Sequence, residues 1–147
     1  MRTQRLGVTW LELLVTLAIV GILLAMLLPR YTGNVEHARA NEAYGNLKLI
    51  LAGQRVYRLK TGYYLPNAAW AAAQGRNANV DEINQFLRLK IEEKNFVYDA
   101  GPSTASTFTA TATRRADAPA PYNDDAYQVD ENGLITAQGG GFEPPSD

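Results

Sequence analysis

The residue types that most often carry out catalysis are scarce in this chain of 147 residues. It has no cysteine, which excludes a disulfide framework, a thiolate zinc site and a cysteine nucleophile. The single histidine, His37, offers no imidazole cluster for metal binding or general-base chemistry. The serines lie in turn-like or tail sequence, and no glycine pattern matches a phosphate-binding loop. The sequence therefore predicts a protein that is not an enzyme and needs no cofactor.

A group of carboxylates near the C-terminus is a second candidate functional site, for binding a metal ion. Asp124, Asp125, Asp130 and Glu131 could supply the oxygen ligands that Ca²⁺ prefers. Their spacing does not match an EF-hand loop. We interpret them as a solvated acidic hairpin, and we predict no metal site.

Glu12 is unusual because it is the only ionisable side chain in a long apolar run, Val8–Leu28. As a helix, those 21 residues cover about 31 Å, close to the hydrocarbon thickness of a bilayer. No small-residue cleavage site follows, so we interpret the run as a retained membrane span rather than a secretory signal peptide. Arg2 and Arg5 precede it, and the positive-inside rule predicts a cytoplasmic N-terminus.

A carboxylate inside such a span costs up to roughly 3 kcal/mol on insertion scales, so Glu12 needs an explanation. One interpretation is that Glu12 lies near enough to the cytoplasmic interface to reach headgroup water. The other is that it meets a cation inside an assembly, because intramembrane ionisable residues are usually paired.

A short basic leader ending in Gly7 precedes the apolar run, which begins at Val8 and carries Glu12 at its fifth position. Gly21 and Pro29 follow. This arrangement resembles the class III signal of type IV prepilins and of the pseudopilins of type II secretion. The resemblance is close over about the first 35 residues and looser up to residue 66. It implies an α+β, pilin-like fold in which a long N-terminal helix, membrane-spanning in its first half, carries a C-terminal head.

The resemblance also implies roles for these residues. A prepilin peptidase would cut between Gly7 and Val8, releasing residues 1–7, and the new amine of Val8 would be methylated. Glu12 would pair with the Val8 amine of a neighbouring subunit, where the two charges offset each other's desolvation. Residues 8–29 would form the transmembrane and assembly helix, with a kink or local melting at Pro29 and unwinding from Gly21 onward in a filament.

Residues 30–60 are predicted to continue the helix as an amphipathic stem. Their apolar side chains fall on two faces rather than one. The first face holds Ala40, Ala43, Leu47, Ile50 and Leu51, and the second holds Ala38, Leu49, Ala52 and Val56. We expect the first face to pack on the protein's own head and the second to serve a neighbouring subunit.

Residues 61–137 are predicted to form a globular α+β head, followed by a flexible tail at 138–147. Asn79 with Asp81 and Glu82 indicates the N-cap of a short helix that ends near Lys90 to Lys94. Four strand patterns follow, at residues 95–100, 106–114, 126–130 and 134–137. They predict an antiparallel sheet of three or four strands packed on the stem. Residues 116–122 are predicted to be an exposed loop.

The charge is divided between stem and head. Residues 30–60 carry a net charge of +4 and residues 61–147 carry −6, which suits contacts between the stem of one copy and the head of another. The basic stem and the pair Arg114-Arg115 also leave open a DNA-binding, DNA-uptake pilin, although we expect nucleic acid not to be a partner.

We therefore predict a structural subunit of a type II secretion pseudopilus or a type IV pilus. The short head, the lack of a terminal cysteine pair and the Thr-Gly-Tyr turn slightly favour the pseudopilus. Its partners would be its own copies, related minor pilins or pseudopilins, a prepilin peptidase, an inner-membrane assembly platform and, before assembly, lipid. It would cross the bacterial inner membrane once, with its head in the periplasm or outside the cell. A membrane-anchored protein that never polymerises is the remaining alternative.

Overall fold

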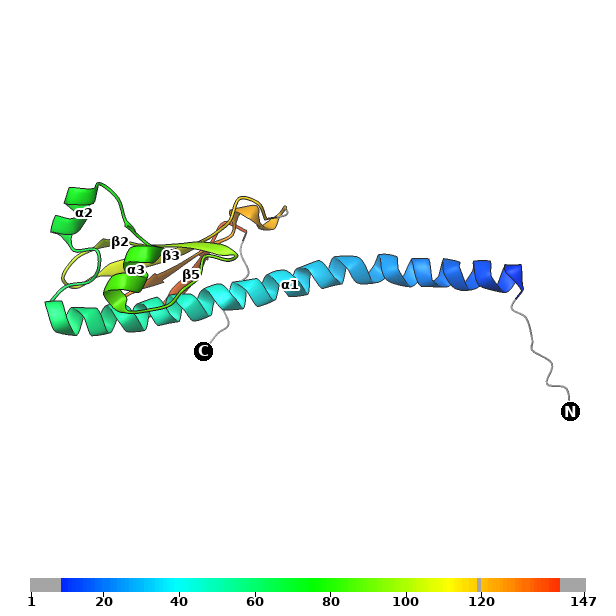
Figure 1. Cartoon of the computed structure of the whole chain (residues 1–147), viewed down its shortest axis with the longest axis horizontal. Coiled ribbons are helices and arrows are strands. Elements are labelled where there is room, and N and C mark those ends of the chain that lie inside the picture. Colours follow the sequence, from blue (N-terminus) through cyan, green and yellow to red (C-terminus); the bar gives the residue numbers. More distant parts are fainter. Residues whose placement is uncertain (1–8, 119, 141–147) are drawn as a thin grey trace, which may run out of the picture. The chain divides into compact units, whose positions relative to one another are not determined.

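The computed structural model describes residues 9–118 and 120–140, apart from the side chains of residues 27–30. The chain divides into two compact units, Met1–Glu36 and His37–Asp147. Helix α1, Trp10–Thr61, contributes residues to both units. The strands and the other helices all belong to the second unit (Figure 1).

In the first unit, α1 is an unbroken helix through Gly21 and Pro29. The local melting predicted at Pro29 is therefore not seen as a break in the helix. A proline removes one backbone hydrogen bond, and residues on both sides of it can remain helical. Leucine, alanine and methionine, which are good helix formers, are frequent in this segment.

In the second unit, α1 shows the two faces that the sequence predicts. All five residues assigned to the first face are buried, whereas Ala38, Leu49, Ala52 and Val56 are exposed. The helix ends at Thr61, one residue past the predicted stem of residues 30–60. Gly62 follows at φ 84° and donates its N–H to the Arg58 carbonyl oxygen at 2.8 Å, a left-handed conformation that favours glycine after a helix.

The sheet has five antiparallel strands in the order β1-β2-β3-β4-β5. Their bounds are β1 Ala78–Asn79, β2 Phe96–Ser103, β3 Phe108–Arg114, β4 Ala126–Asp130 and β5 Ile135–Gln138. The predicted sheet of three or four strands lacks β1, which has only two residues and shows no alternation. Each of the four predicted strands is present, with ends that move by up to three residues. The β4–β5 turn has Gly133 at φ 93°, as its sequence predicts.

Two short helices flank the sheet. Helix α3, Val80–Leu87, has the predicted N-cap: the Asn79 side chain accepts from the Glu82 N–H at 3.1 Å, and the Glu82 carboxylate accepts from the Asn79 N–H at 2.9 Å. The prediction that it ends near Lys90 to Lys94 is wrong, because Arg88 adopts a left-handed conformation and stops the helix. Helix α2, Ala68–Gln74, was not predicted, and a 3₁₀ turn occupies Tyr122–Asp124.

The inner face of the sheet packs against the buried face of α1 within the second unit. Strand β3 directs its apolar residues inward and its threonines to the other side, and the buried ones are Phe108, Ala110 and Ala112. The Tyr44 ring of α1 meets the Tyr127 ring of β4 edge-on, with centroids 4.7 Å apart. Burying one large apolar side chain stabilises a fold by roughly 1.5–3 kcal/mol, so this core holds the stem to the sheet.

Candidate assembly surfaces

The residues with a predicted role lie at the N-terminal end of the chain. Gly7 and Val8 lie outside the described residues. Glu12, Gly21 and Pro29 lie within α1, separated by more than two helical turns from one another. This spacing along one helix keeps the three residues apart in a single copy, so any joint role requires contact with other molecules.

Glu12 lies in the first turn of α1. Its backbone N–H donates to the Thr9 hydroxyl at 3.2 Å, as at a helix N-cap. A carboxylate in the first turn also interacts favourably with the helix dipole. The spacing from Thr9 to Glu12 is that of a capping box. Glu12 therefore also has a local role at the start of the helix, in addition to contact with interfacial water or pairing with a cation.

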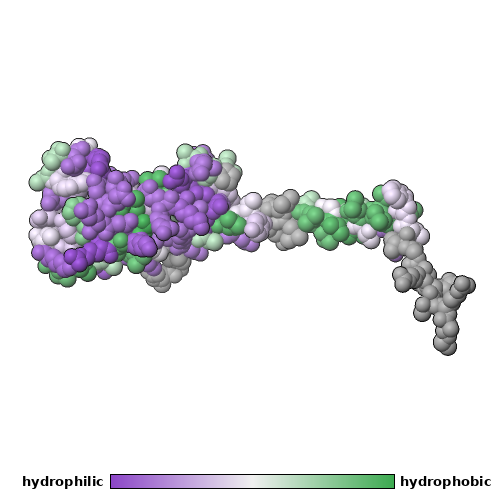
Figure 2. Space-filling model, in the orientation of Figure 1, coloured by the Kyte–Doolittle hydropathy of each residue, from purple (hydrophilic) through white to green (hydrophobic). Residues whose placement is uncertain are grey.

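The first unit exposes its apolar side chains. Every residue from Trp10 to Met26 is exposed, and none of the apolar window within α1 is buried. By length and composition this is the one described helix that could cross a membrane. Figure 2 shows the hydrophobic colour concentrated on this segment, whereas the visible face of the second unit is mostly hydrophilic. Water does not favour such a surface, so it needs a lipid or protein environment.

The stem carries a second exposed apolar surface, which we call the outer stripe: Leu49, Ala52, Val56 and Leu59. The spacing of three, four and three residues places all four on one side of α1. Leu49 and Val56 are each 51% exposed and Leu59 is 88% exposed. Three of these residues were predicted from the sequence to serve a neighbour, and Leu59 extends the set by one turn.

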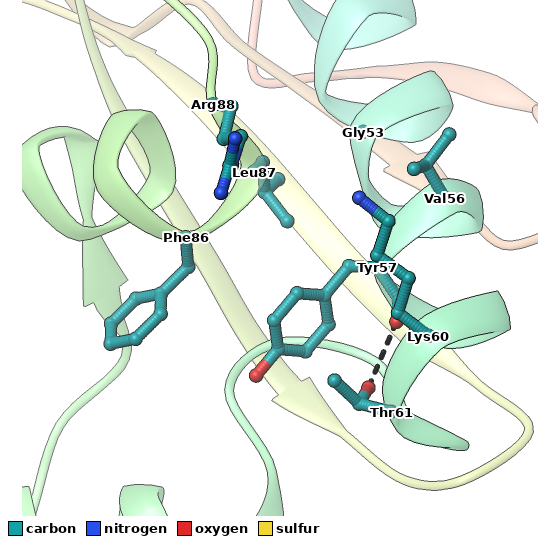
Figure 3. Close-up of a pocket in the computed structure, with 8 residues that line it drawn as sticks. All are labelled: Gly53, Val56, Tyr57, Lys60, Thr61, Phe86, Leu87 and Arg88. Atoms are coloured by element: carbon teal, nitrogen blue, oxygen red, sulfur yellow. Dashed lines mark hydrogen bonds between the residues drawn. The ribbon is translucent and has the colours of Figure 1, made fainter.

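A groove lies between the C-terminal end of α1 and α3, with a volume of about 320 Å³. We call it the stem groove, and its lining is Gly53, Val56, Tyr57, Lys60, Thr61, Phe86, Leu87 and Arg88 (Figure 3). In Figure 3, Tyr57 and Lys60 come from the α1 wall, and Phe86 and Arg88 come from the α3 wall. The groove therefore combines apolar side chains with one cation on each wall.

Gly53 sets how closely the two walls approach. A Cβ atom at this position would lie 3.0 Å from the Leu87 Cβ, so a larger residue would require α3 to shift by a few tenths of an ångström from α1. Burial and the nearby Tyr63 raise the pKa of the Tyr57 phenol, which stays neutral at physiological pH. No local pattern in the sequence indicates this groove, because its two walls are 25 or more residues apart in the chain.

The pair Arg114-Arg115 does not form a basic patch. Arg114 is buried, donates from Nη1 to the Asn95 carbonyl oxygen at 2.6 Å, and lies 5.5 Å from the Phe96 ring centroid. Its guanidinium is thus part of the fold rather than an exposed phosphate ligand. This placement removes one of the two features that left a DNA-uptake pilin open.

The acidic hairpin is organised by its own backbone. Burial alone would raise the pKa of Asp130, but hydrogen bonds from Leu134, Asn132 and Gly133 outweigh it and lower the pKa. Its Oδ1 accepts from the Leu134 N–H at 2.8 Å and from the Asn132 N–H at 3.0 Å. Among the described residues, no group of three or more His, Cys, Asp or Glu is placed to hold a metal ion.

Comparison with known proteins gives relatives of two related kinds. A fimbrial protein of Neisseria meningitidis serogroup B is 35% identical over 105 residues, which cover 68% of this chain and 56% of the relative. The type IV major pilin protein PilE1 of Neisseria gonorrhoeae is 39% identical over 103 residues, covering 68% and 59%. The type II secretion system core protein G of Pseudomonas aeruginosa is 33% identical over 63 residues, covering 43% and 44%.

The matched residues span less than three fifths of each of these relatives. None of the three is named as an enzyme. No protein-family model matches the chain.

Proposed function

Because this chain belongs to the type IV pilin and pseudopilin family, we propose that it is a structural subunit that polymerises through α1 into a pilus or pseudopilus. Its role is assembly, and it performs no reaction of its own. The pilin-like architecture, one long N-terminal helix followed by an antiparallel sheet, supports this proposal.

The observation that carries the proposal is apolar surface that a single copy leaves uncovered. The segment from Trp10 to Met26 suits lipid before assembly and neighbouring helices afterwards. The outer stripe extends exposed apolar surface along the stem of the second unit. A non-polymerising anchored protein would need the first surface but would have no use for the second.

Maturation is the next part of the proposal. A prepilin peptidase cuts between Gly7 and Val8, residues 1–7 are lost, and the Val8 amine is methylated. The carboxylate of Glu12 then pairs with the Val8 amine of a neighbour. This is favourable because a carboxylate and an ammonium meeting in an apolar surround offset each other's desolvation. Unwinding between Gly21 and Pro29 accompanies the move from bilayer to filament.

Topology follows from the charge on either side of the span. Arg2 and Arg5 keep the N-terminus in the cytoplasm, so the second unit lies on the other side of the inner membrane. The remaining partners are related minor pilins or pseudopilins and an inner-membrane assembly platform.

The relatives favour a type IV pilus over a secretion pseudopilus. The longer pilin matches cover 68% of the chain and the shorter ones 48%, whereas the match to the secretion protein covers 43%. This reverses the slight preference drawn from the sequence alone. A deletion strain tests it: loss of surface filaments with normal protein secretion supports the pilus, and loss of secreted proteins with filaments intact contradicts it.

Charge substitution in the outer stripe tests polymerisation itself. Leu49→Glu should leave the protein folded and membrane-inserted but abolish filaments when it is the only subunit, because it puts a charge into a packed apolar contact. Gln85→Glu is the matched control, since Gln85 is exposed on α3 outside the stripe. Normal filaments from Leu49→Glu would show that the stripe is not an assembly surface.

A further inference from the structure

The stem groove has the chemistry of a binding site for an acidic, aromatic peptide. Val56 and Phe86 leave apolar area exposed at its rim, at 51% and 39%. Within the part of the chain that the structure describes, the Lys60 ammonium and the Arg88 guanidinium make no ion pair and no hydrogen bond. A ligand with one aromatic ring and one carboxylate would satisfy both features of the groove.

Arg88 is held in an unfavourable backbone conformation beside this groove. Its φ of 56° and ψ of 44° lie in the left-handed region, where glycine is the usual residue after a helix. Among the described residues, Arg88 is the one non-glycine residue with positive φ. Glycine would relieve the strain but remove the guanidinium, so the side chain has a use that offsets its conformational cost.

The chain itself contains a segment of the required chemistry. Residues 141–147, the end of the predicted tail, lie outside the described residues and have the sequence Gly-Phe-Glu-Pro-Pro-Ser-Asp. The segment has one aromatic ring, two carboxylates and no cationic side chain. Gly139 and Gly140 connect it to β5, and Gly139, at φ 80°, lies against the backbone of Asp124.

Within the second unit, Phe142 and Glu143 are too near Gly140 along the chain to reach the groove of their own copy. Gly140 lies beside Asp125, the residue before β4, and Tyr127 of β4 contacts Tyr44 of α1. The groove is centred near Tyr57, about 20 Å further along α1 from Tyr44. Phe142 is two residues beyond Gly140 and extends at most about 7 Å from it. Phe142 and Glu143 can therefore enter this groove only in a second copy.

We propose that residues 141–147 of one copy bind in the stem groove of a second copy. The ring of Phe142 packs on the apolar side chains at the rim, and the carboxylate of Glu143 lies between Lys60 and Arg88. Gly140, from which the donor segment starts, and the groove are different parts of the second unit, so the contact is heterologous and can repeat from copy to copy. It rests on the proposed filament function and deepens it by naming a contact between heads.

A neighbouring cavity of about 720 Å³ offers two further cations, Arg55 and Arg58, but suits the segment less well. Arg55 donates to the Glu131 carbonyl oxygen at 3.3 Å, and Arg58 lies 5.0 Å from the Tyr64 ring centroid and donates to its hydroxyl. Glu131 also lines this cavity, and its carboxylate would repel Glu143.

Peptide binding tests the proposal without requiring filament growth. The probe is a dye-labelled peptide of residues 139–147 with an amidated end, titrated with the full chain in detergent micelles and followed by fluorescence anisotropy. The chain carries Phe142→Ala and Glu143→Gln so that its own segment does not compete. Empty micelles and a peptide of scrambled order are the blanks. We expect saturable binding that weakens as salt is raised.

Variants then locate the site. Lys60→Glu should lower the affinity at least tenfold, and a peptide with Glu143→Lys should recover most of that loss on this variant alone. Arg88→Gly should lower the affinity while raising the thermal midpoint, because glycine relieves the left-handed strain. Arg58→Glu is the matched control on the same helix and should bind the peptide as the parent does.

Two results would overturn the proposal. One is the absence of saturable binding by the parent protein. The other is a loss of binding in Arg58→Glu with none in Lys60→Glu, which would place the peptide in the neighbouring cavity. If filaments form normally while the peptide fails to bind, the tail contact is wrong and the subunit function stands. If the peptide binds and the chain never forms filaments, the subunit function is wrong instead.

Discussion

The side-chain amide of Gln54 pairs with the backbone of Leu65 in both directions. Its Nε2 donates to the Leu65 carbonyl oxygen at 2.6 Å, and its Oε1 accepts from the Leu65 N–H at 2.9 Å. Gln54 is completely buried. These two hydrogen bonds hold Leu65, in the segment that follows α1, against Gln54 of the helix, eleven residues earlier in the chain.

Replacing Gln54 with leucine should strongly destabilise the second unit. The substitution leaves a buried N–H and a buried carbonyl of Leu65 without partners, at a cost of roughly 1–3 kcal/mol for each group. We expect the free energy of unfolding to fall by about 2–4 kcal/mol, measured by urea denaturation of the full chain in detergent. Gln85→Leu, at an exposed position of α3, is the control and should change it by less than about 0.5 kcal/mol. Equal effects of the two would mean that the Gln54 pair contributes nothing specific.

Tyr98 should make the protein sensitive to alkali. Burial raises its pKa to about 12, although a hydrogen bond from Asn46 to its hydroxyl, at 2.8 Å, acts in the opposite direction. The unfolded value is about 10, so the folded state favours the neutral phenol. Its contribution to stability is complete below about pH 10 and is lost as the pH rises through about 12.

Tyr98→Phe should therefore flatten the loss of stability between about pH 10 and pH 12. At neutral pH the same variant should be less stable by about 1 kcal/mol, because the hydrogen bond with Asn46 is lost. Urea denaturation followed by circular dichroism across this range measures both effects. Tyr63→Phe, at a more exposed position, should keep the alkaline slope of the parent. An unchanged slope in Tyr98→Phe would contradict the assignment.

Two glycines of α1 should respond in opposite ways to alanine. At Gly45 an added methyl group would meet nothing within 4 Å, so Gly45→Ala should stabilise the helix by about 0.5–1 kcal/mol. At Gly53 the new methyl would lie 3.0 Å from Leu87 and push α3 away from α1. Gly53→Ala should therefore cost about 1–3 kcal/mol. Thermal unfolding of both variants measures the difference, and stabilisation by Gly53→Ala would show that α3 moves without cost.

The variant Glu12→Ala distinguishes the two explanations for a carboxylate in the apolar segment. If it only reaches interfacial water, Glu12→Ala should be harmless. If it pairs with the Val8 amine of a neighbour, the substitution leaves that ammonium unpaired in each contact, at about 3–5 kcal/mol for a broken buried pair.

We expect Glu12→Ala to be inserted and cleaved after Gly7 like the parent yet to form no filaments as the only subunit. Electron microscopy and mass spectrometry of the membrane fraction measure the two outcomes. Thr16→Ala, one turn further along α1, is the control. Filaments of normal number and length from Glu12→Ala would exclude the pairing.

Elements with a regular pattern could be predicted from the sequence. The alternation of Phe108, Ala110 and Ala112 with threonines placed β3 on the correct face, and the Asn79–Glu82 spacing located the start of α3. Both signals are local, because each depends only on residues within one element. The division of the stem into a buried and an exposed face was predicted for the same reason.

Other features depend on contacts that a single sequence does not display. Helix α2 is seven residues long and mostly alanine, so it has no apolar periodicity, and only the Asn67 N-cap and Gly75 mark its ends. Arg88 stops α3 in a conformation for which arginine gives no signal. The stem groove exists because Gly53 meets Leu87, a contact between residues 34 positions apart.

The short strands at the two edges of the sheet limit aggregation between crowded copies of the protein. An exposed edge strand can pair with any other strand, and long, flat edges promote aggregation. Here the edges are β1, with two residues, and β5, with four. Subunits held in one bilayer with their heads on the same side would collide far more often than in dilute solution. Edges this short offer few backbone groups for pairing between the sheets of two copies. Crowding in the membrane would therefore favour polymerisation through α1 over aggregation of sheet edges.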